Sequence, residues 1–582
     1  MKYYVGMDIG GSWLKAAAIQ INEGDTKENI KNACLTTKVV RVESHLCTNG
    51  SCDNFINAID SAIDQLQVPY HSVAGIGIST AGVVNYQGTK LILCAPHLSP
   101  LQSDKWIDYL KKKTSSPVVM INDADAAAIG ASAFDYLKGN KIYAIMPIGT
   151  GIGFTVVRNG RRWTPNYSLP LLGSIYSPCG SFDQLVSASL LSKKASSEKL
   201  QDIFINQEYQ KIKEEYLNNL VGIISSAHIL YGIDEVLIGG GLIDASVKYN
   251  FNDDLEKEIN NLLKSKGLLT SVNTRARLLK EGNKLPLIGA ILLSIGESQA
   301  QSLKEIPSYK DLKTEMAYDS SLSLDKMDTN SIINLLNKAE KEAASNFERT
   351  IPKLSEVVDI ITEQLKQGGR LIYVGCGTSG RLASVDAVEI ACTFGFPREK
   401  VLAFISGGIA DAAIDIETNF EEDASAIPDL LIANITSKDV IIGISVSGSA
   451  YYVQSALAYA KHLGAPTIMI QESEKENLPF CDHVLPLSTG SEIIAGSTRM
   501  KAGTATKKMT NFISTTVMIK LGKVHGTYMT ELECINEKLM KRATNILKSL
   551  FNLEEKEAIN LLNNNQFKLN QAIANYTNKT YL

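Results

Sequence analysis

The strongest constraint on the fold of this chain is a unit that recurs through its second half. Each unit is a run of β-forming apolar residues, then a turn of small and hydroxyl residues, then a helix-compatible stretch. The apolar runs are RLIYVGCG, KVLAFIS, DVIIGISVS, APTIMI and HVLPL. Because strand, turn and helix alternate, the pattern predicts an α/β fold, a doubly wound parallel sheet with helices on both faces.

The rest of the chain divides around this series. A length of 582 residues exceeds what one typical core supports. Residues 1–300 alternate β-rich runs with helix-compatible segments, and their turns are rich in glycine. Residues 301–318 gather Ser, Asp and Lys without apolar periodicity and predict a linker. The strand–turn–helix series occupies residues 319–537, and apolar residues at helical spacing predict a small helical subdomain over residues 538–582.

Composition excludes several classes of protein. The formal net charge is −4 and no stretch has dense Lys/Arg clustering, so we expect no nucleic-acid partner. No run of about 18 apolar residues occurs, so we expect no membrane span. The start, MKYYVGMDIGGSWLKAAAIQ, lacks the apolar core of a signal peptide. Nine cysteines without CxxC spacing predict reduced thiols, and the predicted location is cytoplasmic.

Three glycine-rich turns mark the first half: DIGGSWLK, PIGTGIGF and EVLIGGGL. Glycine lets backbone N–H groups approach an anion, and an aspartate at a strand end can position Mg²⁺ beside it. A plain turn between two hairpin strands is the alternative for the first. The candidate nucleotide-binding residues are Asp8, Gly10, Gly11, Ser12, Lys15, Gly149, Thr150, Gly151 and Gly240, and Asp8 is also the candidate metal ligand.

These turns resemble the phosphate-1, phosphate-2 and adenosine motifs of the actin-like ATPase superfamily, and specifically the sugar kinases of the ROK family, over nearly all of residues 1–297. The resemblance implies a two-lobed, ribonuclease H-like kinase that uses ATP and Mg²⁺. In INDADAAAIGAS it implies that Asp123 takes the proton from the attacking sugar hydroxyl and that Asn122 holds a substrate hydroxyl. A helix N-cap is the alternative role for Asp123.

One stretch departs from the ROK pattern. Where the family carries a Glu-x-Gly-His sugar contact and a cysteine-rich zinc loop, this chain reads LLGSIYSPCGSFDQLVS. Leu171 and Ser174 replace the glutamate and the histidine, and only Cys179 remains of the cysteines, so no zinc is expected. The sugar pocket should be roomier and less polar on this side, which favours a substituted sugar over glucose.

Three turns of the second half offer hydroxyls and backbone N–H groups at predicted helix N-termini: GCGTSGR, SVSGSAYYV and GSTRMKAGTATKK. Such ends bind anions, and without a GxxxxGK[ST] loop a monophosphate is favoured over a nucleotide. Helix capping is the alternative for each. The candidate substrate-binding residues are Thr378, Ser379, Ser445, Ser447, Ser449, Ser497 and Thr498.

Together with STTVMIKLGKVHGTYM, these motifs resemble those of the SIS-domain N-acetylmuramic acid 6-phosphate etherases, over roughly residues 314–582. Departures such as Thr506 in place of glutamine remove no ionisable group. The resemblance implies elimination of a lactyl ether by two carboxylates, without a metal or organic cofactor.

The first of these carboxylates is Glu389, as the acid. Its apolar helical neighbours predict a pKa raised by desolvation, and pairing with a neighbour such as Arg381 is the alternative. The second is expected at Glu421 or Glu422 in DIETNFEED, unless this acidic cluster is a solvated helix face.

The fusion implies a sequential pair: 6-phosphorylation of N-acetylmuramic acid, then release of D-lactate, in the recovery of peptidoglycan sugars. The resemblance also implies a homodimer with small-molecule sugars as ligands. Two alternatives remain. The kinase half could take another amino sugar such as N-acetylglucosamine, or the SIS half could be a non-catalytic phosphosugar sensor.

Overall fold

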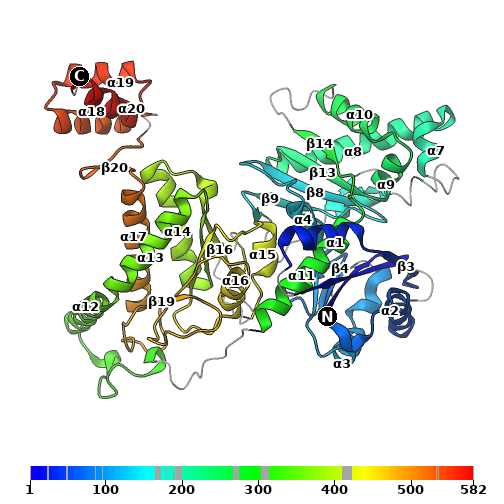
Figure 1. Cartoon of the computed structure of the whole chain (residues 1–582), viewed down its shortest axis with the longest axis horizontal. Helices are drawn as coiled ribbons and strands as arrows, with labels where there is room; N and C mark the ends of the chain where they lie inside the picture. Colours follow the sequence, from blue (N-terminus) through cyan, green and yellow to red (C-terminus); the bar gives the residue numbers. More distant parts are fainter. Residues whose placement is uncertain are drawn as a thin grey trace. The chain divides into compact units, whose positions relative to one another are not determined.

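The computed structural model describes two compact units. Unit 1 comprises Met1–Lys304 with Ser406–Ile435, and unit 2 comprises Glu305–Ile405 with Thr436–Leu582 (Figure 1). No helix among the described residues is both long and apolar enough to cross a membrane. The described residues are 2–22, 25–46, 50–85, 87–94, 96–163, 172–177, 180–187, 191, 200–265, 274–302, 313–408, 423–532, 534 and 536–580.

Unit 1 contains two five-stranded sheets with the same topology, which confirms the predicted two-lobed architecture. The orders are β3-β2-β1-β4-β7 and β10-β9-β8-β13-β14. In each sheet the first three strands along the chain are antiparallel neighbours, and the last two run parallel to the first. The strands are β1 (Lys2–Ile9), β2 (Trp13–Ile21), β3 (Val39–Glu43), β4 (Val73–Thr80), β7 (Val118–Asn122), β8 (Ile142–Ile148), β9 (Thr155–Arg158), β10 (Arg161–Arg162), β13 (Glu235–Gly240) and β14 (Arg275–Leu278).

Helices and short hairpins complete unit 1. The helices are α1 (Lys27–Thr36), α2 (Cys52–Leu66), α3 (Lys105–Lys113), α4 (Asp123–Ala133), α5 (Phe182–Val186), α7 (Leu200–Ile205), α8 (Gln210–Tyr231), α9 (Gly241–Lys248), α10 (Asn252–Ser265), α11 (Leu285–Gln301) and α15 (Ile427–Ile432). The short strands are β5 (Val83–Val84), β6 (Leu91–Leu93), β11 (Tyr176–Ser177) and β12 (Gly180–Ser181).

Unit 2 is built on one parallel sheet with the order β16-β15-β17-β18-β19, as the doubly wound prediction requires. Its strands are β15 (Leu371–Gly375), β16 (Val401–Ile405), β17 (Val440–Ile444), β18 (Thr467–Gln471) and β19 (His483–Pro486). Its helices are α12 (Thr329–Asn346), α13 (Ile351–Lys366), α14 (Gly377–Phe394), α16 (Tyr451–His462) and α17 (Lys501–Lys520). A hairpin of β20 (Val524–His525) and β21 (Tyr528–Met529) leads to the helical tail of α18 (Glu537–Phe551), α19 (Glu555–Asn564) and α20 (Leu569–Thr580).

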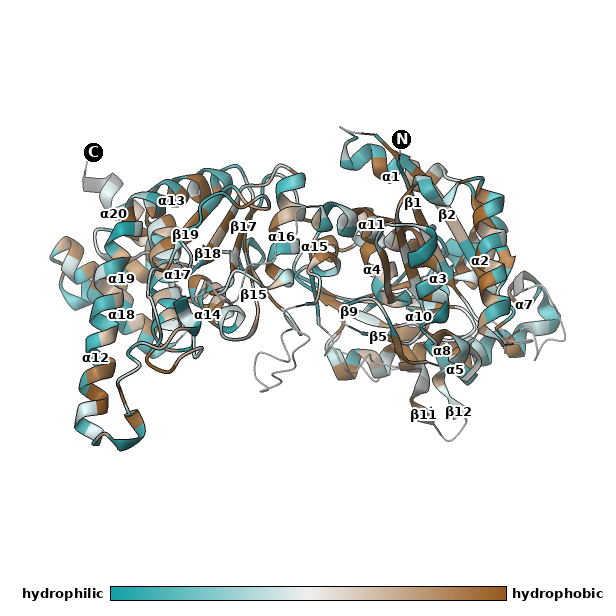
Figure 2. Ribbon diagram, turned by 90° about the horizontal axis from the view of Figure 1, so that it is seen from below, coloured by the Kyte–Doolittle hydropathy of each residue, from teal (hydrophilic) through white to brown (hydrophobic). Residues whose placement is uncertain are grey.

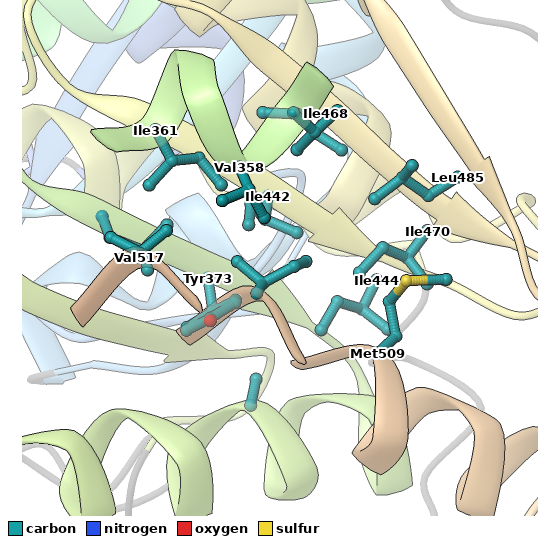
Figure 3. Packing of buried hydrophobic residues seen from close by; sticks show 14 of the residues in the cluster. Val358, Ile361, Tyr373, Ile442, Ile444, Ile468, Ile470, Leu485, Met509 and Val517 are labelled. Atoms are coloured by element: carbon teal, nitrogen blue, oxygen red, sulfur yellow. The ribbon is translucent and has the colours of Figure 1, made fainter. Parts of the chain in front are cut away.

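Apolar side chains from both layers form the core of unit 2. Residues of α13 and α17, such as Ile361 and Val517, meet alternate residues of the strands, such as Ile442 and Ile468, on one face of the sheet (Figure 3). Helix α16 contacts β15, β17 and β18 from the remaining side. In Figure 2 many helices carry hydrophilic as well as hydrophobic segments. Burial of these apolar faces provides the main driving force for folding.

Helices α4 and α11 of unit 1 pack with their backbones in contact. A Cβ added to Gly289 would lie 1.9 Å from the carbonyl oxygen of Ala126, and one added to Gly130 would lie 2.5 Å from that of Leu285. Only small residues permit this approach. Because α4 begins at Asp123, the contact fixes the position of a predicted catalytic residue.

We predict that Gly289→Ala lowers the free energy of unfolding of unit 1 by about 3 kcal/mol, because the new methyl group must displace the α4 backbone. The matched control is Gly222→Ala in α8, where an added Cβ meets nothing within 4 Å. That change should stabilise by about 0.5–1 kcal/mol. Urea denaturation of both variants measures the difference, and equal stability would contradict the close packing.

Candidate active sites

The strand order of unit 2 reverses between β15 and β17. From β15 the chain passes to β16 on one side and then crosses to β17 on the other. In open α/β sheets, ligands bind at the carboxyl ends of the strands where this reversal occurs. Gly375 and Ile444, the last residues of the two strands, are partners in the parallel register. The first two predicted hydroxyl turns therefore lie beside each other at this point.

The first turn leads directly from β15 into α14. Gly377 has a φ of +48°, which favours glycine, and the preceding Cys376 makes no side-chain cap bond. Thr378 is exposed and Ser379 is half-buried. Because the first N–H groups of a helix lack intrahelical partners, this end is suited to an anion.

The second turn leads into α16, whose N-cap residue Ala450 makes no side-chain cap bond. Ser445 Oγ accepts from the Gly448 N–H at 3.1 Å, and Ser447 Oγ accepts from the Ser449 N–H at 3.2 Å. The hydroxyls of Ser447 and Ser449 lie 2.6 Å apart. Three serine hydroxyls are thus gathered in one tight turn, with Gly448 at a φ of +75°.

The third turn differs, because a carboxylate already fills the end of α17. Glu492 is completely buried, and its two oxygens accept from the N–H groups of Lys501 at 3.1 Å and Ala502 at 2.9 Å. Burial raises the pKa of Glu492. Ser497 and Thr498 precede this end and are half-buried. No pattern in the sequence marks Glu492 as the cap, because it lies nine residues before its first partner.

The predicted burial of Glu389 is wrong for the single chain. Its side chain is 63% exposed, and its Oε2 lies 3.2 Å from Lys507 Nζ. The neighbours that suggested an apolar environment, Val385 and Val388, are themselves exposed, at 44% and 61%. Helical periodicity turns this side of α14 away from the core. The pairing alternative holds, with Lys507 of α17 as the partner that the structure gives.

A second carboxylate, Asp386, lies one turn before Glu389 and faces inward. It is 2% exposed and accepts hydrogen bonds from Tyr373 Oη at 2.9 Å and Ser514 Oγ at 3.0 Å. Burial raises the pKa of Asp386 to about 6. The sequence analysis missed this residue, although an aspartate three residues before a glutamate in an apolar helix is a readable signal.

Some predicted positions lie outside the described residues: Leu171, Cys179, Glu421 and Glu422. The backbone of Ser174 lies in a short helical turn.

In unit 1, the first glycine turn joins β1 to β2 in an antiparallel hairpin, as the alternative interpretation held. Asp8 lies at its base. Its Oδ2 is 3.2 Å from Lys15 Nζ, and its Oδ1 accepts from Ser79 Oγ at 2.9 Å. Gly10 and Gly11 form the turn and Ser12 is exposed. The hairpin is compatible with anion binding, because the turn lies beyond the ends of the two strands.

The other two glycine turns of unit 1 are neighbours. The stretch Gly149–Gly151 follows β8, and Gly240 ends the adjacent strand β13 in register with Ile148. Gly240 has a φ of +108°, and a Cβ there would lie 2.0 Å from the Ile148 carbonyl oxygen. Asp183, which the sequence analysis did not single out, accepts from the Ile152 N–H at 2.6 Å beside this turn, and burial raises its pKa.

Asn283 links β2 to α9 in unit 1. Its side chain accepts from Lys15 Nζ of β2 and also bonds Asp244 of α9. Burial raises the pKa of Asp244. Nothing in the sequence marked Asn283 or Asp244, because their proximity to Lys15 arises only when both sheets are in place.

Asn122 and Asp123 occupy the junction of β7 and α4. Asn122 is the N-cap: its Oδ1 accepts from the N–H groups of Ala124 and Asp125, and its Nδ2 donates to the Gly82 carbonyl oxygen at 3.0 Å. The capping role considered for Asp123 thus belongs to Asn122. Burial, and then the negative charge of Asp8, raise the pKa of Asp123 to about 7.

These groups fit the nucleotide and metal that the sequence implies. Backbone N–H groups in glycine turns and the Lys15 ammonium are types of donor that suit phosphate oxygens. Mg²⁺ is commonly held by one or two carboxylates together with substrate phosphates, and Asp8 could supply one of these. Among the described residues, no three His, Cys, Asp or Glu side chains form a ready-made metal cluster.

Comparison with known proteins assigns each half of the chain. Residues 4–166 match the ROK family, residues 353–461 match the glucokinase regulatory protein N-terminal SIS domain, and residues 418–512 match the SIS domain. A ROK family glucokinase from Streptomyces griseus, solved with glucose and AMPPNP, aligns with a TM-score of 0.38 and 19% identity, over 50% of this chain and 99% of that one.

Two relatives are both named N-acetylmuramic acid 6-phosphate etherase. The protein from Mycoplasma mycoides subsp. mycoides is 40% identical over 266 residues, which are 45% of this chain and 87% of the relative. The protein from Prochlorococcus marinus is 43% identical over 264 residues, which are 45% of this chain and 85% of the relative.

Proposed function

The C-terminal half of this chain belongs to the N-acetylmuramic acid 6-phosphate etherase family, and from that membership we propose that it cleaves the D-lactyl ether of N-acetylmuramic acid 6-phosphate. The observation that carries the proposal is the pair of hydroxyl turns that lead into α14 and α16 and lie beside each other where the strand order reverses. The phosphate would be bound there by Thr378, Ser379, Ser445, Ser447 and Ser449. The remaining candidates, Ser497 and Thr498, come just before the start of α17 in the sequence.

The chemistry requires one acid and one base. Opening of the sugar ring exposes an aldehyde at C1, which acidifies the proton on C2. A carboxylate at Glu421 or Glu422 would take that proton, and Glu389 would protonate the departing ether oxygen. Water then adds to the alkene, which gives N-acetylglucosamine 6-phosphate and D-lactate. This scheme needs no cofactor.

The ROK domain would supply the substrate of that reaction by phosphorylating the C6 hydroxyl of N-acetylmuramic acid. ATP with Mg²⁺ would bind at Asp8, the Gly149–Gly151 turn and Gly240, and would supply the phosphoryl group. Asp123 would accept the hydroxyl proton, since a pKa of about 7 suits a general base near neutral pH. Asn122 Oδ1 already caps α4, and its Nδ2 donates one hydrogen bond to Gly82. Asn122 would therefore contact the substrate hydroxyl through the second hydrogen on Nδ2. The two activities together would recover peptidoglycan sugars in the cytoplasm.

A second candidate function for the SIS half rests on one observation. Residues 353–461 match the SIS domain of a regulatory protein, so a non-catalytic phosphosugar sensor is the competing proposal. A sensor requires the phosphate turns but neither carboxylate, and the first experiment below therefore separates the two.

We further propose that two copies of the chain associate through the outer side of α14 and α17. Val385 and Val388 of α14 and Phe512 and Ile519 of α17 are large apolar side chains that are 44–61% exposed. Helices α14 and α17 contact each other, so these residues belong to one helix layer. A second copy would remove them from water and would also bury Glu389.

The first prediction concerns the etherase. Incubation with N-acetylmuramic acid, ATP and Mg²⁺ should release D-lactate, whereas Glu389→Gln should accumulate the phosphorylated sugar and release lactate at least about 100-fold more slowly, because the acid is lost. A coupled lactate assay and mass spectrometry follow both steps. Sustained phosphorylation and phosphosugar binding without any lactate from the parent protein would instead support the sensor.

The second prediction concerns the kinase. Its rate at saturating ATP should rise with pH and level off above about 7, because only ionised Asp123 accepts a proton. Asp123→Asn should lower the rate by about 100-fold or more and abolish this dependence, while cleavage of supplied N-acetylmuramic acid 6-phosphate continues. A flat profile in the parent protein would argue against Asp123 as the base.

The third prediction concerns assembly. The protein should sediment as a dimer, and Val388→Asp should yield monomers because the charge cannot be buried without a partner. Ile205→Asp is the control, since Ile205 is 55% exposed and belongs to unit 1 rather than to the α14–α17 layer. Analytical ultracentrifugation distinguishes the states, and a monomeric parent protein would refute the proposal.

A further inference from the structure

Helix α15 comes from the SIS half of the sequence but belongs to the kinase unit. It lies within residues 418–512, which match the SIS domain, whereas the segment that contains it, Ser406–Ile435, is part of unit 1. We propose that Ser132 and Asn434, which join α4 to the end of α15, are positioning residues of the kinase and hold the helix that begins at Asp123. This inference rests on the proposed kinase function. It gives a segment of the SIS half a role in phosphorylation.

The α15 segment packs closely on unit 1. Helix α15 contacts α4, α11 and strand β10 (Figure 1). Its residues Ile427, Leu430 and Ile432 are buried, and so are all residues of α4 in the range Ala124–Ser132. Because this contact removes apolar surface of both helices from water, it stabilises their arrangement.

Two hydrogen bonds join the end of α15 to the end of α4. Ser132 Oγ donates to the Ile432 carbonyl oxygen at 2.7 Å, and Asn434 Nδ2 donates to the Ser132 carbonyl oxygen at 3.2 Å. Asn434 Oδ1 also accepts from Lys27 Nζ of α1. The last carbonyl groups of a helix lack partners in the next turn, so donors from outside stabilise both helix ends.

A second connection reaches the start of α4 through strand β10. The turn before β10 packs on Ala433, whose Cα would lie 3.4 Å from a Cβ added to Gly160. Within β10, Arg162 Nη1 donates to Asp125 Oδ2 at 2.7 Å. Asp125 is buried and follows Asp123 by two residues. Helix α15 therefore contacts one end of α4 directly and is connected to the other end through β10.

A helix held at both ends resists tilting. Helix α4 has 11 residues, a length of about 16 Å. If its far end loses the bonds to α15, a shift of that end also moves the Asp123 carboxylate at its start. A base must lie within hydrogen-bond distance of the hydroxyl, so a displacement of about 1 Å is enough to lower the rate.

The test combines Ser132→Ala with Asn434→Gly in the full-length chain. Both hydrogen bonds are then lost, and glycine tolerates the φ of +51° at position 434. The kcat of phosphorylation should fall by about 10-fold, because the base is displaced. The KM for ATP should not change, because the groups proposed for ATP belong to β1, to β13 and to the turn after β8. Lactate release from supplied N-acetylmuramic acid 6-phosphate should also be unchanged.

The matched control is Ser225→Ala in α8. Ser225 is a buried serine whose Oγ donates to the Val221 carbonyl oxygen of its own helix at 2.8 Å. Its loss should lower the melting temperature and leave kcat unchanged. The control thus separates loss of a buried hydrogen bond from displacement of α4.

Hydrogen exchange followed by mass spectrometry tests whether α4 itself is loosened. The amides of α4 should exchange faster in the double variant than in the parent protein, whereas those of α8 should exchange at the same rate in both. Unchanged exchange in α4 would show that α15 does not hold this helix and would overturn the inference.

The kinetic outcomes separate the inference from the function on which it rests. A parent protein that phosphorylates no sugar overturns the kinase proposal and this inference with it. An active parent protein whose kcat is unchanged in the double variant, or falls equally in Ser225→Ala, overturns the inference alone. Helix α15 would then be only a packing element of unit 1.

Discussion

Parallel hydrogen bonding between neighbouring strands is the interaction on which both candidate sites depend. In a parallel pair the carboxyl ends meet at one edge of the sheet, so residues far apart in the sequence become neighbours. In unit 2 this places the turns after β15 and β17 together, and in unit 1 it places Gly240 against the end of β8. The same rule brings Ser79 of β4 beside Asp8 of β1. The helices cover these sheets and hold the edges in place.

Whether a helix end is already capped decides what it can bind. Glu492 caps α17 and Asn122 caps α4, whereas the N-cap residues of α14 and α16 make no side-chain cap bond. An anionic ligand competes with a capping carboxylate for the same N–H groups, and the capping carboxylate has the advantage because it loses no translational entropy on binding. The Glu492 carboxylate therefore holds the start of α17 against an anionic ligand.

Much of this could be predicted from the sequence, and the misses have a common cause. The strand runs and the glycine and serine turns are local patterns, and the two-lobed architecture is what the family resemblance carried by those turns implies. The structure confirms the strands and the two lobes. The environment of Glu389 is not local. Val385 and Val388 are apolar, but helical periodicity turns them outward with Glu389, whereas Asp386 faces the core. Asn283 and Glu492 were missed because their partners lie on other elements, without any fixed spacing.

By itself the sequence determined which segments become strands and helices, which turns expose N–H groups and hydroxyls, and which families the two halves resemble. These follow from backbone conformation and from side-chain periodicity, which act over a few residues. Only the tertiary structure decided which carboxylates are buried, which helix ends are already capped, and that Lys507 lies against Glu389. Burial and electrostatic interaction depend on distances between elements, and these distances are set when the helices pack on the sheet.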